Sequence, residues 1–190
     1  MVSCNVQRIP RTTSEKKKTF VSIERKDYIK EYNSLAIKEM KRSGIPASIT
    51  LAQAMLESDN GNSTLARKAN NHFGIKCHSS WKGAKVYHDD DKRNECFRKY
   101  KSIYSSYIDH SDFITNNNRY QFLFELSLSD YKAWAKGLQK AGYATSRTYA
   151  ELLIKIIDNN QLYVYDQGGS LSFTSEASTV SKNASASSSK

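Results

Sequence analysis

The spacing of apolar residues predicts a chain built mostly of amphipathic helices. Beyond Lys26, apolar side chains recur every three or four positions until Ser43-Gly44, where this helical period stops. An almost wholly apolar helix is expected next, with Pro46 in its first turn, and the run Asp59-Asn60-Gly61-Asn62 ends it. A short helix from Ser63 to Ala69 follows, with Ser63 as its N-terminal cap.

A different pattern occupies residues 70 to 101. Asn70 and Asn71 indicate a loop, and two short strand-like runs follow at 85–88 and 96–100. The polar segment 89–94 lies between these runs and is typical of a hairpin turn. The pattern therefore predicts a small β lobe inserted into a helical protein.

Helical spacing resumes at Ser102 and stops in the run Asn116-Asn117-Asn118. A short helix is expected over 120–126, and a longer one begins after Asp130 as cap and closes at Gly142. The last long amphipathic helix runs from Thr148 through Ile157. The predicted fold class is mostly α with one inserted β-hairpin lobe.

The two ends of the chain differ from its middle. Residues 1–24 are polar and lysine-rich and read as a flexible basic leader, and the Ser-rich segment 167–190 is expected to be disordered. This leaves one folded domain over residues 25–166, with the β lobe at about 70–101. No run of ~18 apolar residues predicts a transmembrane helix, and no hydrophobic signal core follows Met1.

The start of the leader allows two interpretations. Met1-Val2-Ser3-Cys4 resembles the end of a bacterial lipoprotein signal, in which Cys4 is the acylated residue and the following polar stretch is a tether. The alternative is an incidental cysteine near a start codon. Contact with a membrane is expected only through lipidation of Cys4.

Composition narrows the range of binding partners. The chain carries 29 Lys and Arg against 19 Asp and Glu, a formal net charge of +10, which attracts polyanions. Neither an arginine-rich helix nor an aromatic-interleaved basic stripe is present, so nucleic acid is not expected as a partner. Twelve Tyr residues suit either ordinary core packing or a groove that binds sugars.

The three cysteines leave one unpaired after any pairing. Cys77 and Cys96 flank the predicted hairpin, so a disulfide between them is a candidate, and it fits an oxidising envelope compartment. Two free buried thiols are the alternative.

Glu57 is the main candidate for catalytic chemistry. It falls at the carboxyl end of the apolar helix, where burial and the negative end of the helix both disfavour its charged form. A raised pKa is what a general acid needs if it is to donate a proton near neutral pH. The alternative is a surface glutamate at a helix end.

Four motifs in order resemble the bacterial glucosaminidase family, glycoside hydrolase family 73, within the lysozyme-like superfamily. They are the catalytic-helix segment Pro46 to Ser63, the segment Asn70-Asn71-His72-Phe73-Gly74-Ile75-Lys76, the strand Cys96-Phe97-Arg98-Lys99-Tyr100, and Ala141-Gly142-Tyr143-Ala144-Thr145 with Tyr149 after it. Together they cover nearly the whole of the predicted domain. The resemblance implies a lysozyme-like fold.

The resemblance also implies an activity and roles for single residues. It implies cleavage of the β-1,4 bond after N-acetylglucosamine in peptidoglycan, with Glu57 as general acid. Phe73 is then expected as a sugar platform, Tyr143 near the reacting centre, and Tyr149 among the substrate-binding residues. Asn71 is likewise expected among the substrate-binding residues, and it is also expected to brace the β lobe against the helix. Ordinary packing is the alternative for these residues.

The second catalytic group stays open at this point. Glycoside hydrolysis usually needs a partner that activates water or stabilises an oxocarbenium-like charge. The glutamate proposed in the hairpin of family members has no clear counterpart here, and Asp90 and Glu95 are the candidates. A solvated acidic turn is the alternative, and in that case the acetamido oxygen of the substrate serves as nucleophile.

No metal site or cofactor is expected, because the four His and three Cys lack H-x-x-x-H or C-x-x-C spacing. The leading hypothesis is a peptidoglycan hydrolase of the bacterial envelope, either periplasmic, anchored in the outer membrane as a lipoprotein, or secreted. A muramidase or lytic transglycosylase with the same acid is one alternative. A cell-wall-binding module without catalysis is the other.

Overall fold

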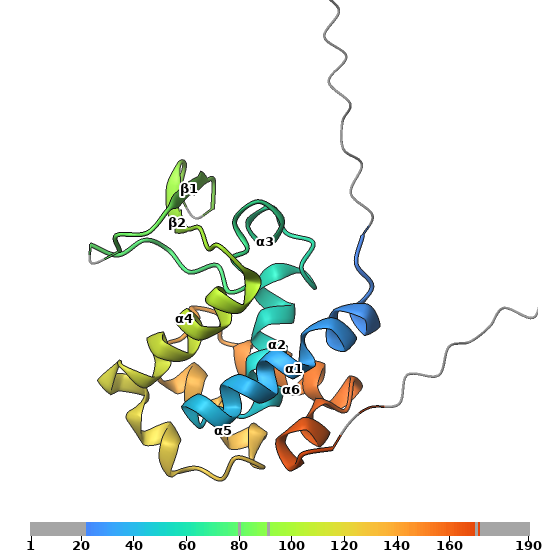
Figure 1. Cartoon of the computed structure of the whole chain (residues 1–190). Helices are drawn as coiled ribbons and strands as arrows, with labels where there is room; N and C mark the ends of the chain where they lie inside the picture. The colour runs from blue at the N-terminus through green and yellow to red at the C-terminus, as the bar shows by residue number, and fades with distance from the viewer. Residues whose placement is uncertain (1–21, 80, 91, 170, 172–190) are drawn as a thin grey trace, which may run out of the picture.

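The structure is a computed structural model and describes residues 22–79, 81–90, 92–169 and 171. Its elements, in chain order, are α1 (Arg25–Ser43), α2 (Ala47–Ser58), α3 (Thr64–Ala69), β1 (Lys85–His88), β2 (Glu95–Arg98), α4 (Ile103–Thr115), η1 (Asn118–Glu125), α5 (Tyr131–Lys140), α6 (Tyr149–Asn159) and η2 (Leu162–Gln167). The mostly α fold with one inserted β hairpin is therefore confirmed (Figure 1). Most of the basic leader, including Cys4, and most of the Ser-rich tail lie outside the described residues. Among the helices described, none has the length and apolarity needed to cross a membrane.

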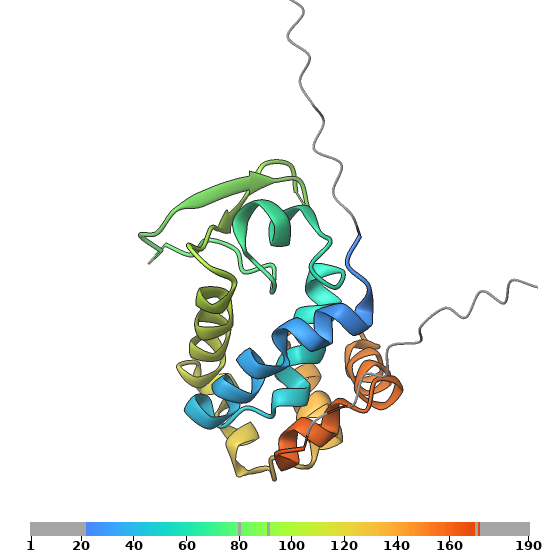
Figure 2. The same cartoon turned by 45° about the vertical axis from the view of Figure 1, so that its right-hand side comes forward.

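Helix α2 forms the centre of the helical part, with α1 and α6 beside it (Figures 1 and 2). Ten of its twelve residues are buried, as expected for a helix that is apolar on every side. The helix ends after Ser58, because Asp59 and Asn60 (both φ 50°) and Gly61 (φ 78°) adopt left-handed conformations. This turn was predicted from the sequence. It leaves Glu57 in the last turn of a helix that the rest of the domain surrounds.

The helix starts and ends agree closely with the sequence pattern where a single side chain caps the backbone. Ser63 accepts a hydrogen bond from the Ala66 amide, and Asp130 accepts one from the Ala133 amide. Gly44 closes α1 with φ 76°. Pro46 is a small correction: it is the N-cap of α2 and lies just before the first helical turn.

The β lobe is a two-stranded antiparallel hairpin in which Lys85 pairs with Arg98 and His88 pairs with Glu95. The lobe lies at one end of the molecule, next to α3 (Figure 2). The second strand ends two residues earlier than predicted. The reason is that the Tyr100 amide donates to the Ala69 carbonyl at the end of α3, at 2.8 Å, and so leaves the ladder.

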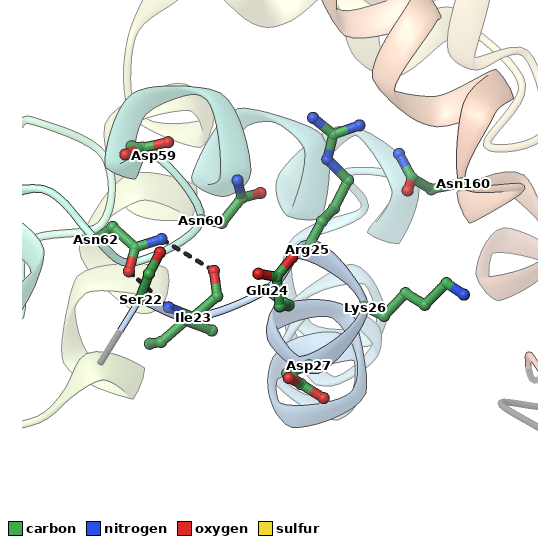
Figure 3. Close-up of a pocket in the computed structure, with 10 residues that line it drawn as sticks. All are labelled: Ser22, Ile23, Glu24, Arg25, Lys26, Asp27, Asp59, Asn60, Asn62 and Asn160. Atoms are coloured by element: carbon green, nitrogen blue, oxygen red, sulfur yellow. Dashed lines mark hydrogen bonds between the residues drawn. The ribbon is translucent and has the colours of Figure 1, made fainter. Parts of the chain in front are cut away.

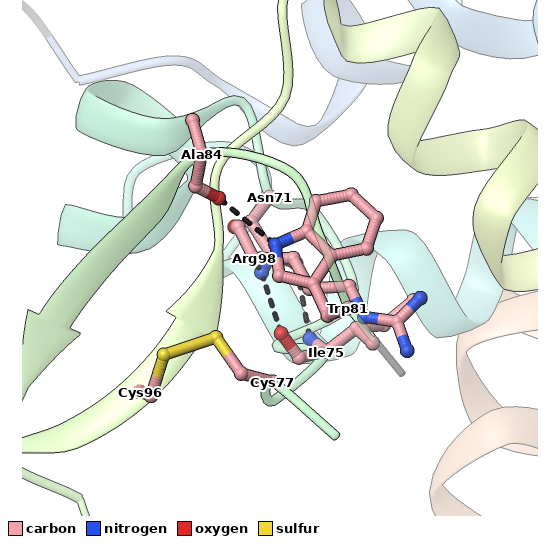
Figure 4. The surroundings of a disulfide bond; sticks show 7 residues. All are labelled: Asn71, Ile75, Cys77, Trp81, Ala84, Cys96 and Arg98. Carbon is pink, nitrogen blue, oxygen red and sulfur yellow. Dashed lines mark hydrogen bonds between the residues drawn. A yellow bond between two sulfur atoms is a disulfide. The ribbon is translucent and has the colours of Figure 1, made fainter. Parts of the chain in front are cut away.

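A disulfide joins Cys77 to Cys96 on β2 (Figure 4). The Cys77 amide also donates to the Cys96 carbonyl at 2.8 Å, so the two segments are linked by a covalent and a backbone hydrogen bond. The free-thiol alternative therefore does not describe this structure. In the same region the indole of Trp81 covers the Arg98 guanidinium, whose centre lies 4.7 Å from the ring centroid.

Candidate active site

Glu57 lines a pocket of about 350 Å³ that lies between the helical part and the β lobe. Its walls come from four other segments: the loop after α3, the hairpin turn, helix α4 and the loop after α5. The lining residues are Glu57, Phe73, Gly74, Ile75, Lys76, His78, Asp90, Phe113, Tyr143, Ala144 and Thr145. The sequence-predicted residues Glu57, Phe73, Asp90 and Tyr143 thus meet in one cavity.

The pKa of Glu57 is raised above its ordinary value. Burial of the carboxyl group among protein atoms is the main cause, and the negative charge of Asp90 adds to it, while a hydrogen bond from Tyr149 acts in the opposite direction. The residue as a whole is nevertheless exposed to solvent, and it lines the pocket. A carboxyl group in this setting holds its proton to a higher pH than a surface glutamate and can deliver it to a molecule in the pocket.

Tyr149 holds one oxygen of this carboxyl group. Its hydroxyl donates to Glu57 Oε1 at 3.1 Å and accepts a hydrogen bond from Gln53 Nε2 at 2.9 Å. Tyr149 is 3% exposed and does not line the pocket, so the substrate contact expected for it is replaced by a contact with the acid. Tyr143 stacks on it, with ring centroids 5.6 Å apart, and separates it from the cavity.

The two hairpin carboxylates have different surroundings. Asp90 lines the pocket, and its Oδ2 lies 3.1 Å from Lys76 Nζ. Glu95 does not line it: both of its oxygens accept from Lys76 Nζ, at 3.0 and 3.1 Å, and Oε2 also accepts from the Lys92 amide at 3.2 Å. The direct pairing of Asp90 with Glu95 suggested by the hairpin is replaced by a shared lysine between them.

Phe73 forms a wall of the pocket, although a role as sugar platform does not fit its surroundings. Its side chain is 4% exposed, and His110 stacks on one face of the ring with centroids 4.0 Å apart. The edge of the ring also packs against Tyr107. A sugar that stacks needs an open aromatic face, and Phe73 offers little of one.

Asn71 has a structural position behind the pocket. Its Nδ2 donates to the Ile75 carbonyl at 3.0 Å and to the Arg98 carbonyl at 2.9 Å, and its Oδ1 accepts from the Ile75 amide. The side chain is 1% exposed, so it has no route to a substrate. It holds the loop after α3 against β2, which is the bracing position expected for it, and a role as direct substrate ligand does not fit.

Four residues of the site were missed by sequence reasoning. Gln53 is fully buried behind Glu57, His110 lies under Phe73, and Lys76 and His78 line the cavity. Gln53 had the one available signal, because it lies four residues before Glu57 and so on the same face of the helix. Lys76 ends one of the quoted motifs, which gave it no role of its own, and tertiary packing brings His78 and His110 to the site without a local pattern.

A larger cavity, of about 790 Å³, lies at the beginning of α1 and beyond the end of α2 (Figure 3). It is lined by a mixture of acids, bases and amides, and the Asn62 side chain bonds both the amide and the carbonyl of Ile23. These bonds fix the start of α1. The cavity contains none of the residues that surround Glu57, so we do not assign the chemistry to it.

Metal chemistry has no obvious ligand set in this part of the protein. Across residues 22–79, 81–90, 92–169 and 171, no group of three His, Cys, Asp or Glu side chains is arranged to hold a metal ion.

Comparison with known proteins gives a consistent result. A family model described as mannosyl-glycoprotein endo-beta-N-acetylglucosaminidase matches residues 33–162. The exo-glucosaminidase LytG of Bacillus subtilis is 40% identical in an alignment 131 residues long that covers 63% of this chain and 46% of LytG. The peptidoglycan hydrolase FlgJ of Vibrio parahaemolyticus is 32% identical in an alignment 140 residues long that covers 68% of this chain and 45% of FlgJ. The chain thus spans less than half the length of these curated relatives.

Solved structures agree with the sequence match. A peptidoglycan hydrolase from Sphingomonas sp. A1 superposes with a TM-score of 0.65 at 32% identity, covering 77% of this chain and 96% of that one. The glycoside hydrolase domain of FlgJ from Salmonella typhimurium superposes with the same TM-score at 30% identity, covering 77% and 94%. The lysozyme-like fold expected from the motifs is confirmed by these similarities.

Proposed function

Because the chain belongs to the mannosyl-glycoprotein endo-beta-N-acetylglucosaminidase family, we propose that it is a glycoside hydrolase that cuts the glycan strands of peptidoglycan. The bond is the β-1,4 linkage after N-acetylglucosamine, and Glu57 is the general acid. One observation carries the assignment of the acid: a carboxyl group of raised pKa opens into a pocket that a second carboxylate, Asp90, also lines.

The proposed reaction begins with protonated Glu57. It donates its proton to the glycosidic oxygen as the bond to the anomeric carbon breaks, and positive charge develops on the sugar ring. Asp90 is the second group, because it lines the same cavity, whereas Glu95 does not line it and bonds Lys76 through both oxygens. Lys76 also lies 3.1 Å from Asp90 Oδ2. Water then adds to the anomeric carbon, and its proton restores the acid form of Glu57.

The position of the substrate determines where such an enzyme works. Peptidoglycan lies outside the cytoplasmic membrane, so we place the protein in the bacterial envelope or among secreted proteins. The formal net charge of +10 favours association with an anionic wall. A disulfide such as Cys77–Cys96 is also typical of an oxidising compartment. Lipidation of Cys4 remains a separate hypothesis about a residue outside the described part.

The test is fragment release from purified peptidoglycan by wild type and Glu57→Gln, followed by mass spectrometry of the products. The amide keeps the shape of the side chain and removes the acid, so the rate is expected to fall by about a hundredfold or more. Glu125→Gln, the same change at an exposed position on η1, is the matched control and is expected to keep full activity. Products of the wild type should carry N-acetylglucosamine at the reducing end.

Other products would point to the remaining hypotheses. N-acetylmuramic acid at the reducing end indicates a muramidase, and an anhydro sugar indicates a lytic transglycosylase. Binding to the wall without release of fragments by either protein would leave only a wall-binding module. The size of the first products separates cuts within strands from removal of terminal sugars, which is relevant because LytG is named an exo-glucosaminidase.

A further inference from the structure

The acid is the end of a short chain of hydrogen bonds that begins on its own helix. Gln53, one turn before Glu57 on α2, donates to the Tyr149 hydroxyl oxygen at 2.9 Å. The Tyr149 hydroxyl donates to Glu57 Oε1 at 3.1 Å. Gln53 is 0% exposed and Tyr149 is 3% exposed, so bulk water does not compete for these bonds.

The first bond fixes the direction of the second. A phenol hydroxyl has a single hydrogen and rotates freely about its C–O bond unless a partner holds it. With the Gln53 amide donating to its oxygen, the hydroxyl hydrogen of Tyr149 points to the other partner, Glu57 Oε1. An oxygen that accepts this hydrogen is a poor place for the acid proton, which is then held on Oε2.

Gln53 keeps this donor at some expense in stability. Its own carbonyl oxygen, Oε1, is buried and has no hydrogen-bond partner among the described residues. A buried polar atom without a partner is unfavourable, and in a native protein it needs an explanation. An apolar side chain of the same length at this position of α2 would pack in the core without leaving a buried oxygen unpaired. Packing alone therefore explains a glutamine here poorly.

We propose that Gln53 is a positioning residue for the acid: its amide turns the Tyr149 hydroxyl toward Oε1, which keeps the proton of Glu57 on Oε2. This inference rests on the proposed function for the identity of the acid. It adds a residue that touches neither substrate nor carboxylate and acts through Tyr149. Without the amide, the Tyr149 oxygen is free to accept from Glu57, and the proton is drawn away from the substrate.

The direct test is a measurement of the pKa of Glu57. The ¹³C NMR signal of its carboxyl carbon is recorded across a pH titration. The Tyr149 bond lowers the pKa of Glu57. Tyr149→Phe removes this hydrogen bond and should therefore raise that pKa. Gln53→Met keeps the length of the side chain and removes the donor, and it should raise the pKa in the same direction. The double variant should show no larger shift than Tyr149→Phe alone.

Gln139→Met is the matched control, because Gln139 also hydrogen-bonds the start of α6, through the Ala150 amide, without reaching Glu57. It should leave the pKa of Glu57 unchanged. In kinetics, Gln53→Met should lower kcat and shift the alkaline limb of the pH–rate profile to higher pH, while KM stays constant. If Gln53→Met does not fold, Gln53→Leu serves the same purpose.

The outcomes separate this inference from the proposed function. An unchanged pKa in Gln53→Met, or shifts that add in the double variant, would overturn the role of Gln53 whatever the activity of the protein. The titration needs no turnover, so it remains decisive even if wild type releases no fragments. In that case the proposed function fails by itself, and the hydrogen-bond chain is still tested.

Discussion

The acidic residues in and next to the pocket differ mainly in their hydrogen-bond and ion-pair partners. Tyr149 bonds Glu57, the Lys76 ammonium lies 3.1 Å from Asp90, and Glu95 has bonds to both Lys76 and a backbone amide. The three acidic side chains in or next to this pocket, Glu57, Asp90 and Glu95, therefore have three different environments. Their hydrogen bonds predict different responses to the same chemical change.

Replacing each hairpin carboxylate with its amide should separate their roles. Asp90→Asn is expected to lower kcat by about a hundredfold, the magnitude typical of losing one charge-stabilising group. It should also lower the pKa of Glu57, because the charge of Asp90 raises it. The alkaline limb of the rate profile then moves to lower pH. Glu95→Gln should change kcat only severalfold; an equal loss in both variants would make Glu95 the second group.

His110 is a second residue whose environment predicts a measurable effect. It is fully buried, neither ring nitrogen has a partner among the described residues, and burial lowers its pKa to about 3. In the unfolded chain a histidine has a pKa of about 6.5. Between these two values the unfolded state binds a proton that the folded state does not bind, so protonation favours unfolding as the pH falls.

The free energy of unfolding should therefore decrease as the pH falls from about 6.5 toward 3, by about 1.4 kcal/mol per pH unit for each such group. His72, whose pKa burial lowers to about 4, contributes over the upper part of this range. His110→Phe keeps the stacked ring and removes the titration, so urea unfolding across this range should show a smaller slope. A slope equal to that of wild type would mean that His110 is protonated in the folded state.

At the scale of elements, the ends of the helices explain why much of the fold was predictable. Ser63 and Asp130 cap helices within three residues of their own position, so the signal lies in the local sequence. Helix α2 is different, because its N-cap is Pro46, which has no side-chain acceptor. Asp166 on η2 supplies the acceptor: its carboxylate bonds the amide and the hydroxyl of Ser48, at 2.8 and 2.6 Å. No local pattern predicts this cap.

Removing this distant cap should weaken the docking of η2 on α2. Asp166→Ala is expected to lower the free energy of unfolding by about 1 to 2 kcal/mol, the range for loss of a helix cap with its hydrogen bonds. Ser48→Ala removes only the hydroxyl bond and should cost less. Both are measured by urea unfolding, and kcat well below the melting temperature should be unchanged. A larger effect for Ser48→Ala than for Asp166→Ala would contradict this assignment.

For the whole molecule, the site lies where the β lobe meets the helical part, and sequence reasoning predicted this only in outline. The order of the elements, the hairpin and Glu57 follow from periodicity and motifs. The contacts that decide the chemistry do not, because Tyr149 is 92 residues from Glu57 and the hairpin turn offered several acidic side chains without a register. Pairing with Lys76 and exposure to the pocket depend on tertiary packing, which has no periodic signature.

The disulfide should matter for the stability of the lobe and for the pocket wall. Cys77 lies between Lys76 and His78, both of which line the cavity. Replacing both cysteines, Cys77→Ala with Cys96→Ala, is expected to lower the free energy of unfolding by about 2 to 4 kcal/mol, as for a disulfide that closes a short loop. Reductant should have the same effect on wild type and none on the double variant. A midpoint of urea unfolding that does not move in either case would contradict this.

Two hydrogen bonds join residues that are far apart in the sequence, and this separation sets an order of events during synthesis. Tyr149 is 92 residues after Glu57, and Asp166 is 118 residues after Ser48. A nascent chain therefore carries Glu57 and Ser48 long before it carries Tyr149 and Asp166, which bond them. A chain truncated before Tyr149 contains the motif around Glu57 but has no partner for that carboxyl group. The site becomes complete only when nearly the whole domain has emerged from the ribosome.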